Sequence, residues 1–479
     1  MKTESSEKLS SKLAEASRIG ECYECGVCTV NCPLAHMIPG HYNPRTAMLR
    51  LFLDPERGLT QIGSWLCMRC RRCSKRCPQK LSPHEIFFLA RSAALERGRV
   101  TDPSRAMNRI AQLLVEELPL PLISGWLCLR PDESDENSAS RTFAEETLKE
   151  LAGRRCSSNK IPREAAEKVA VVGSGPAGLA AASELLKKGY SVTLFEKSSE
   201  PGGMLRHGIP DFRLSKNLVE AEIDHLRDSG AIIKLGTRVG RDTSITTLFE
   251  EGKRAIFLAP GCSTPARLRA EGERLEGVIY ATEFLEDLNS NGQPKMGDSV
   301  LVIGGGNVGI DAARAVMRLK PQKTQLICPE SREEMPSDLT EVTRAEREGL
   351  QIHPSCMPRR ILGKDGRVAG VECVKTKSGQ YDRNGRFLLV PIAGTEFSME
   401  VDTVIVAIGQ QADLSFLPEK IAVGRGNVIV ADPFTMATSM RGVFAGGDAV
   451  LGAASVLEAI YAGWKAANSM DRYLSSGGC

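Results

Sequence analysis

Residues 168–196 read KVAVVGSGPAGLAAASELLKKGYSVTLFE, and this stretch decides the fold. A short β-branched run, a glycine turn, an alanine-rich segment of helical period and a second β-branched run follow one another. Residues 299–330, SVLVIGGGNVGIDAARAVMRLKPQKTQLICPE, repeat the same order. Each stretch predicts a β-α-β unit, so the sequence predicts an α/β fold with two domains of similar build.

The first glycine turn has the spacing of a dinucleotide-binding turn. Gly173, Gly175 and Gly178 form G-x-G-x-x-G between a predicted strand and a predicted helix. The first glycine permits the tight turn, the second lets the backbone approach a pyrophosphate, and the third allows helix and sheet to pack closely. Glu196 ends the next strand, where a carboxylate can accept hydrogen bonds from ribose hydroxyls. The alternative for Glu196 is an ordinary surface glutamate.

The second glycine turn also lies between a predicted strand and a predicted helix. Gly304, Gly306 and Gly309 follow a predicted strand and precede a predicted helix. We therefore expect two Rossmann-like nucleotide-binding domains.

Eight of the fifteen cysteines lie between residues 22 and 77, in two runs of identical C-x2-C-x2-C-x3-C-P spacing. This is the spacing of bacterial two-cluster ferredoxins, in which the fourth cysteine of each run binds the other cluster. We therefore predict two [4Fe–4S] clusters, one on Cys22, Cys25, Cys28 and Cys77, and the other on Cys67, Cys70, Cys73 and Cys32. The alternative is a pair of structural zinc sites. Zinc usually takes two C-x2-C pairs, so the extra Cys-Pro in each run argues against it.

Composition and charge exclude several classes of protein. The 479 residues suggest about three domains. Lys and Arg number 62 against 59 Asp and Glu, and this near balance argues against nucleic-acid binding. The first thirty residues lack the pattern of a signal peptide, and the apolar stretch 118–129 is too short to span a membrane. We expect a soluble cytoplasmic chain without a transmembrane segment, in a reducing compartment where thiols can hold metal.

The cysteine-rich part resembles a known family. The segments CGVCTVNCP (25–33), NPRTAMLRLFLDPERG (43–58) and WLCMRCRRCSKRCP (65–78) are similar to the ferredoxin-like C subunit of heterodisulfide reductases. The resemblance covers about residues 15–95. Cations between the second set of cysteines would raise the potential of an anionic cluster or offer a docking face, the alternative being a solvated basic loop; they are Arg69, Arg71, Arg72, Lys75 and Arg76.

The rest of the chain resembles a second family. EKSSEPGGMLRHGIPDFRL (196–214), APGCSTPARL (259–268), GVIYATEFL (277–285) and TSMRGVFAGGDAVLGAASVLEAIYAGWKAA (438–467) look like the small subunit of glutamate synthase and its relatives. These relatives include the electron-input part of dihydropyrimidine dehydrogenase and the larger subunit of NADH-dependent ferredoxin:NADP oxidoreductase. The resemblance implies that the first turn binds FAD and that a nicotinamide domain is inserted into the FAD domain.

The two resemblances imply an order of domains. We expect a small helical ferredoxin-like domain at 1–100, a connecting region at 101–165, a first part of the FAD domain at 166–294, an NAD(P)H domain at 295–408 and a second part of the FAD domain at 409–479. Within the connecting region, the polar run 130–141 predicts a loop.

The second family also implies which residues contact each nucleotide. The expected FAD contacts are Gly173, Gly175, Pro176, Ala177, Gly178, Glu196, Lys197, Gly203, Arg213, Val239, Gly447 and Asp448; an arginine such as Arg213 is as often structural. The expected nicotinamide-nucleotide contacts are Gly304, Gly306, Asn307, Val308, Gly309, Glu330 and Arg332.

The second nucleotide site departs from its family. The family usually ends the strand after the helix with a tyrosine and two arginines that bind the 2′-phosphate of NADPH. Here Pro329 and Glu330 occupy the arginine positions. A carboxylate there favours a free 2′-hydroxyl and repels a 2′-phosphate, so we predict NADH over NADPH. Two alternatives stay open: Arg332 could reach a phosphate, or the domain could be a scaffold that has lost its nucleotide.

No protein side chain is predicted to act as catalyst. No C-x-x-C pair lies near the predicted flavin, and Cys262 fits a small buried residue. We expect His207 to tune the flavin or to pack against its neighbours, and not to act as a general acid or base. Hydride transfer between a nicotinamide and a flavin needs no protein base, so the protein positions the rings and sets potentials.

The sequence thus predicts an NAD(P)H:acceptor oxidoreductase. We expect an NADH-oxidising input subunit of an anaerobe's iron–sulfur or flavin complex, related to heterodisulfide reductase, that delivers single electrons to other redox subunits or to a ferredoxin-type carrier. One alternative is the small subunit of NADPH-dependent glutamate synthase, whose family has an altered cysteine spacing. The other is an electron relay or scaffold without nicotinamide activity.

Overall fold

The computed structural model describes residues 18–96, 166–377 and 390–477. The predicted connecting region 101–165 lies outside them. The chain divides into two compact units: the first comprises residues 1–203, 214–261 and 414–479, and the second comprises residues 204–213 and 262–413. Because the second unit is inserted into the first, the predicted nesting of one nucleotide domain within the other is confirmed.

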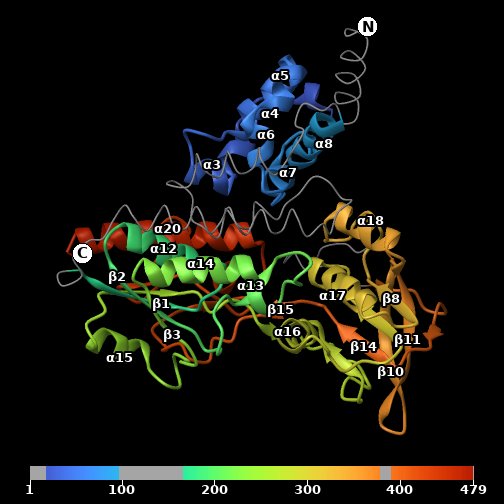
Figure 1. Cartoon of the computed structure of the whole chain (residues 1–479). Coiled ribbons are helices and arrows are strands. Elements are labelled where there is room, and N and C mark those ends of the chain that lie inside the picture. Colours follow the sequence, from blue (N-terminus) through green and yellow to red (C-terminus); the bar gives the residue numbers. More distant parts are fainter. Residues whose placement is uncertain (1–17, 97–165, 378–389, 478–479) are drawn as a thin grey trace. The chain divides into compact units, whose positions relative to one another are not determined.

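The cysteine-rich domain is helical, as predicted (Figure 1). Proline at the first helical position begins α3, α4 and α5. Asn43 caps α4 and Asp54 caps α5, each by accepting a hydrogen bond from a backbone N–H in the first turn. The helices of this domain are η1 (Ile19–Glu21), α2 (Val27–Val30), α3 (Pro33–Met37), α4 (Pro44–Leu53), α5 (Pro55–Thr60), α6 (Ile62–Leu66), α7 (Arg72–Arg76) and α8 (Pro83–Glu96).

The first unit also contains a parallel five-stranded sheet with the order β18-β4-β1-β2-β3. Its strands are β1 (Lys168–Val172), β2 (Ser191–Phe195), β3 (Ile232–Lys234), β4 (Ala255–Leu258) and β18 (Val443–Ala445). Helices α12 (Pro176–Lys187), α14 (Lys216–Asp228) and α20 (Val456–Ser475) lie side by side (Figure 1). The remaining elements are α15 (Ile245–Glu250), α19 (Asp448–Leu451) and a small ribbon of β16 (Val423–Gly424) and β17 (Val428–Ile429).

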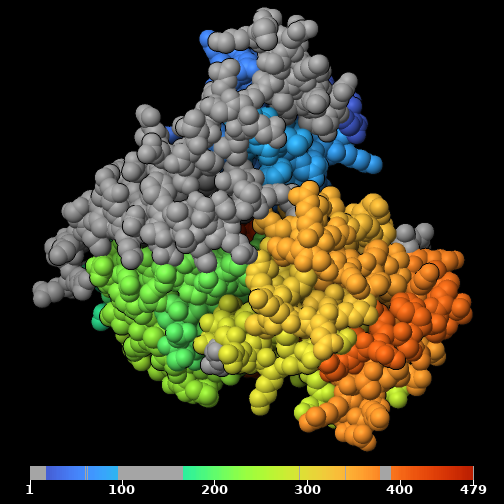
Figure 2. Space-filling model, turned by 45° about the vertical axis from the view of Figure 1, so that its right-hand side comes forward, coloured from blue at the N-terminus to red at the C-terminus, as the bar shows by residue number. Residues whose placement is uncertain are grey.

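The second unit is built on a similar parallel sheet with the order β6-β14-β7-β8-β9. Its strands are β6 (Val278–Tyr280), β7 (Ser299–Ile303), β8 (Lys323–Ile327), β9 (Gln351–His353) and β14 (Thr403–Val406), and its helices are α13 (Met204–His207), α16 (Ala281–Asn291), α17 (Asn307–Arg318) and α18 (Leu339–Arg347). Figure 2 shows the surface of residues 262–413 in yellow to orange.

An antiparallel extension completes the second unit. It consists of β10 (Cys356–Lys364), β11 (Arg367–Lys377), β12 (Val390–Pro391) and β13 (Phe397–Met399), and a two-stranded ribbon joins β5 (Thr264–Pro265) to β15 (Gln410–Gln411). The expected start of this domain at residue 295 lies inside the unit, whose main segment begins at Cys262. The difference arises because β6 pairs with β14 and so belongs to the second sheet.

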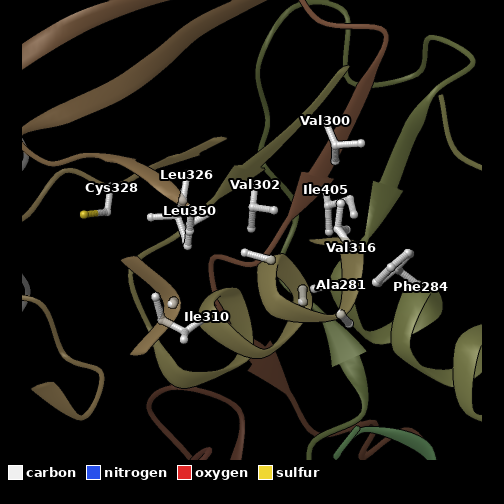
Figure 3. Close-up of a cluster of buried hydrophobic side chains, with 14 of the residues drawn as sticks. Ala281, Phe284, Val300, Val302, Ile310, Val316, Leu326, Cys328, Leu350 and Ile405 are labelled. Atoms are coloured by element: carbon white, nitrogen blue, oxygen red, sulfur yellow. The ribbon is translucent and has the colours of Figure 1, made fainter. Parts of the chain in front are cut away.

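The core of the second unit explains its continuous apolar strands (Figure 3). Val300, Val302 and Ile405 from the sheet pack with Ile310 and Val316 from α17, and all five side chains are fully buried. Burying one such side chain contributes about 1.5–3 kcal/mol to folding. Parallel strands covered on both faces read as apolar runs, which is why the sequence predicted them.

No helix in the described part of the chain is long and apolar enough to cross a membrane.

Candidate functional site

The first glycine turn has the geometry of a dinucleotide cradle. Gly173 has a φ of 100°, and a Cβ on it would lie 2.2 Å from the carbonyl oxygen of Ala259. A Cβ on Gly178 would lie 1.9 Å from the carbonyl oxygen of Gly173. Gly175 differs, because a Cβ there would meet no described atom within 4 Å. The turn is therefore closed where the chain must pack and open where a pyrophosphate would lie, at the N-terminus of α12.

Glu196 is held at the end of β2 by the turn itself. Its Oε2 accepts a hydrogen bond from the backbone N–H of Ser174 at 3.0 Å, and its Oε1 accepts one from Ser198 N–H at 2.9 Å. The hydroxyl of Ser174 also donates to Glu196 and accepts from the N–H of Gly202. The carboxylate is thus fixed beside the turn, where a ribose would lie.

The C-terminal glycine pair reaches the same turn. Gly447 has a φ of 67°, and a Cβ on it would lie 2.9 Å from the Cβ of Ala177 on α12. Asp448 follows it at the start of α19, and burial raises the pKa of Asp448 to about 7. Residues far apart in sequence therefore converge on the N-terminus of α12, and the cradle fits FAD.

The second glycine turn repeats this geometry. Gly304 has a φ of 131°, and a Cβ on it would lie 2.3 Å from the carbonyl oxygen of Ala407. A Cβ on Gly309 would lie 2.0 Å from the carbonyl oxygen of Gly304, whereas one on Gly306 would meet no described atom within 4 Å. Asn307 accepts a hydrogen bond from the N–H of Asp338. This cradle fits a second dinucleotide.

Glu330 lies against the second turn. A Cβ placed on Gly305 would come within 3.4 Å of Oε2 of Glu330. That oxygen is buried and accepts no hydrogen bond from any residue that the structure describes, and burial raises the pKa of Glu330. Arg332 is engaged elsewhere, since its Nε and Nη2 donate to the two carboxylate oxygens of Glu346 at 3.1 and 2.7 Å. The turn is therefore lined by a carboxylate, and the nearby arginine is neutralised.

Several other predicted residues have different surroundings. Arg213 is partly buried and pairs with Asp311 on α17 at 2.5 Å, within the second unit, so its contact in the structure is an ion pair. Val239 is buried after β3, and Lys197 is exposed. Cys262 is buried, and His207 has one ring nitrogen 4.0 Å from Glu286.

The two cysteine loops share one backbone conformation. Residues on either side of the second cysteine adopt left-handed φ values: Glu24 at 52° and Gly26 at 77° in the first run, and Arg69 at 51° and Arg71 at 62° in the second. Non-glycine residues in this region cost roughly 1–2 kcal/mol each. The two runs therefore share one local loop geometry, in keeping with their identical cysteine spacing.

The fourth cysteine of the first run lies with the second run. Burial raises the pKa of Cys32, and the charges of Cys70, Cys67 and Cys73 raise it further. The pKa of Cys28 is raised by burial and, among thiols, by Cys22 and Cys25. Cys32 thus lies near the thiols of the second run, while the crossed assignment of all eight ligands stays a prediction. Among the described residues, no three His, Cys, Asp or Glu side chains are gathered closely enough to hold a metal ion, so the side-chain positions do not distinguish zinc from an iron–sulfur cluster.

Two features of this domain were not predicted from the sequence. Arg91 on α8 is 2% exposed and donates hydrogen bonds to the backbone around Cys67. Its signal in the sequence is an arginine within the apolar run IFFLARSAAL. Arg72, which lies between Cys70 and Cys73, forms an ion pair of 3.1 Å with Glu458 on α20, in the same unit.

Two dinucleotide cradles and two cysteine loops in one chain define a flavin- and nicotinamide-dependent iron–sulfur oxidoreductase. Residues 167–467 match the family described as pyridine nucleotide-disulphide oxidoreductase, and residues 18–81 match a 4Fe-4S dicluster domain. The chain belongs to the pyridine nucleotide-disulphide oxidoreductase family. The predicted FAD-binding and iron–sulfur domains are therefore confirmed.

Characterised relatives are redox subunits. The chain is 45% identical over 314 residues to the NADP(+)-dependent formate dehydrogenase subunit beta of Moorella thermoacetica, which covers 65% of this chain and 44% of that protein. It is 33% identical to the NADPH-Fe(3+) oxidoreductase subunit beta of Geobacter sulfurreducens, over 85% of this chain and 64% of that protein. A glutamate synthase [NADPH] small chain of Mycobacterium tuberculosis is 34% identical over 95% of this chain and 87% of its own. The chain thus spans about half to two thirds of the first two relatives, and the resemblance to glutamate synthase small subunits is confirmed.

Solved structures share the fold of the nucleotide-binding part. Mycobacterium tuberculosis FprA in complex with NADPH matches with a TM-score of 0.56 at 17% identity, over 66% of this chain and 86% of that one. Thioredoxin reductase of T. acidophilum matches with a TM-score of 0.51 at 23% identity, over 64% of this chain and 99% of that one. These similarities confirm two Rossmann-like domains.

Proposed function

We propose that this chain is an electron-input subunit that takes a hydride from NADH and delivers single electrons through its two cysteine-bound clusters to a partner protein. Bound FAD would supply the chemistry that links the two, because a flavin exchanges electrons in pairs with nicotinamide and singly with iron–sulfur clusters. The chain's own residues would bind the two nucleotides, orient their rings and exclude water from between them.

The observation that carries the choice of NADH is the position of Glu330. Its buried, unpartnered Oε2 lies over the second glycine turn, where it would accept a hydrogen bond from a ribose 2′-hydroxyl and repel a 2′-phosphate. Arg332 is already paired with Glu346 and does not offset that charge. Three of the relatives above are named for NADP(+) or NADPH, so this preference would distinguish the present chain from them.

The route from flavin to clusters is supported by the pairing of Arg72 with Glu458. Arg72 lies between two predicted cluster ligands, and Glu458 is part of the capping box that begins α20. That helix packs on α12, whose N-terminus forms the FAD cradle. The cluster on Cys32, Cys67, Cys70 and Cys73 would therefore receive electrons first.

The other cysteine group fits an exit to the partner. Cys25 is exposed, and the cations Lys75 and Arg76, just before Cys77, are exposed as well. Long-range attraction to such a surface favours an acidic partner face. The partner would be a subunit of an iron–sulfur or flavin complex, of the kind related to heterodisulfide reductase, or a ferredoxin-type carrier.

A second function has its own support. The match to a glutamate synthase small chain spans 95% of this chain and 87% of the relative, so the small subunit of a glutamate synthase is the other candidate. Glu330 argues against this second candidate if its carboxylate determines the choice between NADH and NADPH.

An anaerobic titration tests the proposal. The purified, iron-reconstituted protein would be titrated with NADH and separately with NADPH, while the flavin and cluster absorbances are followed. The proposal expects prompt bleaching by NADH with little by NADPH. Preference for NADPH would contradict the interpretation of Glu330 and favour the glutamate synthase role. Absence of bleaching with either nucleotide would indicate a relay or scaffold.

A further inference from the structure

Arg91 is a buried cation for which the described structure provides no anionic side chain. Its side chain lies on α8, in the core of the cysteine-rich domain, and is 2% exposed. No carboxylate forms an ion pair with it among the described residues. An isolated buried charge costs far more than a buried neutral group unless an opposite charge lies near, so an arginine this deep requires a partner.

The hydrogen bonds of Arg91 account for its orientation but not for its charge. Its Nε donates to the carbonyl oxygen of Ser64 at 2.8 Å, and its Nη2 donates to those of Trp65 at 3.1 Å and Cys67. These carbonyls end α6, where backbone oxygens lack helical partners. The guanidinium therefore closes the helix and fixes the backbone of Cys67. It also lies 6.0 Å from the ring centroid of Trp65, but no carboxylate among the described residues balances its full charge.

The neighbouring groups leave one candidate for the opposite charge. Tyr42 is also buried in this domain, and its phenol is neutral in its ordinary form. Arg69, also near, is another cation. Nη2 of Arg91 donates to the carbonyl oxygen of Cys67, which is one of the predicted cluster ligands, so an anionic cluster at that cysteine would place the missing negative charge beside the guanidinium.

We infer that the counter-ion of Arg91 is the anionic cluster bound by Cys32, Cys67, Cys70 and Cys73, and that Arg91 is the residue that positions Cys67 and raises the reduction potential of that cluster. This inference rests on the iron–sulfur part of the proposed function and not on the choice of nucleotide. A nearby positive charge stabilises the reduced, more negative form, and local charge and hydrogen bonding set cluster potentials. The hydrogen bonds of Arg91 within the described residues include one to Cys67 and none to Cys22, Cys25, Cys28 or Cys77, so we expect the effect on one cluster only.

Three variants separate charge from shape. Arg91→Lys keeps the charge but loses the planar fork, Arg91→Gln keeps polarity but loses the charge, and Arg50→Gln removes an exposed arginine of the same domain as the matched control. The reconstituted full chain would be analysed for iron per chain and for midpoint potentials by EPR-monitored titration. Single variants of Cys32 and Cys77 assign each signal to its cluster.

We expect Arg91→Gln to move the midpoint potential of the cluster on Cys67 to a more negative value and to leave the other cluster unchanged. Arg91→Lys should keep most of the wild-type potential, and Arg50→Gln should change neither. If Arg91→Gln instead fails to hold that cluster, so that about half the iron is lost, retention of the iron by Arg91→Lys supports the same conclusion.

Three results would overturn the inference. Arg91→Gln could hold both clusters at wild-type potentials, both clusters could shift together, or Arg91→Lys and Arg91→Gln could behave alike, which would mark a packing role only. Because none of these readouts uses NADH or a partner protein, they are independent of the nucleotide titration. Absence of any iron–sulfur signal in the wild-type protein would instead contradict the proposed function itself.

Discussion

Gly463 on α20 lies against Ala177 on α12 so closely that a Cβ on Gly463 would stand 2.0 Å from the carbonyl oxygen of Ala177. Ala177 is the second residue of α12, directly after the open face of Gly175. The packing of α20 on α12 and the shape of the predicted FAD cradle therefore both depend on the absence of a side chain at Gly463.

Gly463→Ala should push α12 away from α20 and weaken both folding and flavin binding. Overpacking of a tight contact typically costs about 1–3 kcal/mol. The expected result is a lower unfolding midpoint and loss of FAD during gel filtration. Gly40→Ala is the control, because a Cβ there would meet no described atom within 4 Å. Equal flavin retention in both variants would contradict the prediction.

Glu330→Ser should shift the nucleotide preference. Removing the carboxylate removes both the acceptor for a 2′-hydroxyl and the repulsion of a 2′-phosphate. We expect the ratio of kcat/KM for NADH to that for NADPH to fall about tenfold, which corresponds to about 1.4 kcal/mol. Glu333→Ser, at an exposed neighbouring position, should leave the ratio unchanged. An unchanged ratio in Glu330→Ser would remove Glu330 from the specificity site.

Pairs of cysteine variants test the crossed ligation. Cys32→Ser with Cys67→Ser should remove one cluster, leaving about four irons per chain, whereas Cys67→Ser with Cys77→Ser should remove both. Uncrossed ligation would give the reverse pattern. Iron analysis with EPR distinguishes the two arrangements, and Cys262→Ser, a buried cysteine outside both runs, is the control.

Glu458→Gln should slow electron transfer to the clusters without slowing flavin reduction. Glutamine can still complete the capping box of α20, so the helix is kept, but the ion pair with Arg72 loses its charge. In a stopped-flow experiment, cluster bleaching should lag several-fold behind flavin bleaching. Arg72→Ala should show the same lag, and wild-type kinetics in both variants would exclude this pair from the route.

Asp448 should make the stability of the flavin-free protein depend on pH. Burial raises its pKa from about 3.8 to about 7, so the folded state holds a proton that the unfolded state releases. The stabilisation is complete below about pH 4 and is lost as the pH rises through about 7. Asp448→Asn should therefore lose less stability than the wild type between pH 4 and 8, as measured by thermal unfolding. Glu419→Gln, at an exposed position, should follow the wild type.

The sequence predicted the parts of the fold that local signals determine. The runs KVAVV and SVLVI became β1 and β7 with the same bounds, and the glycine turns lie between strand and helix as their spacing requires. The cysteine spacing predicted a grouping of Cys32 with the second run, and this ligand assignment stays a prediction.

The parts that were not predicted depend on contacts between distant segments. The pairing of β6 with β14 joins residues 278–280 to 404–406 and moves the start of the second unit to Cys262. The pairing of Arg213 with Asp311 could not be predicted because the two residues lie 98 positions apart, and the flavin contact of Arg213 stays a prediction. Arg91 belongs to no sequence motif. The carbonyl and thiol groups near it come from other segments of the domain, which the local sequence does not indicate.

The nesting of the two units sets an order for their completion during synthesis. Every strand of the second sheet has been made by Val406, so that sheet can form while the rest of the chain is still in the ribosome. The first sheet still lacks its edge strand β18, and the FAD cradle still lacks Gly447 and the helix that packs on α12. The second sheet can therefore be complete before the first, and the predicted FAD cradle closes only once residues 443–475 have been made.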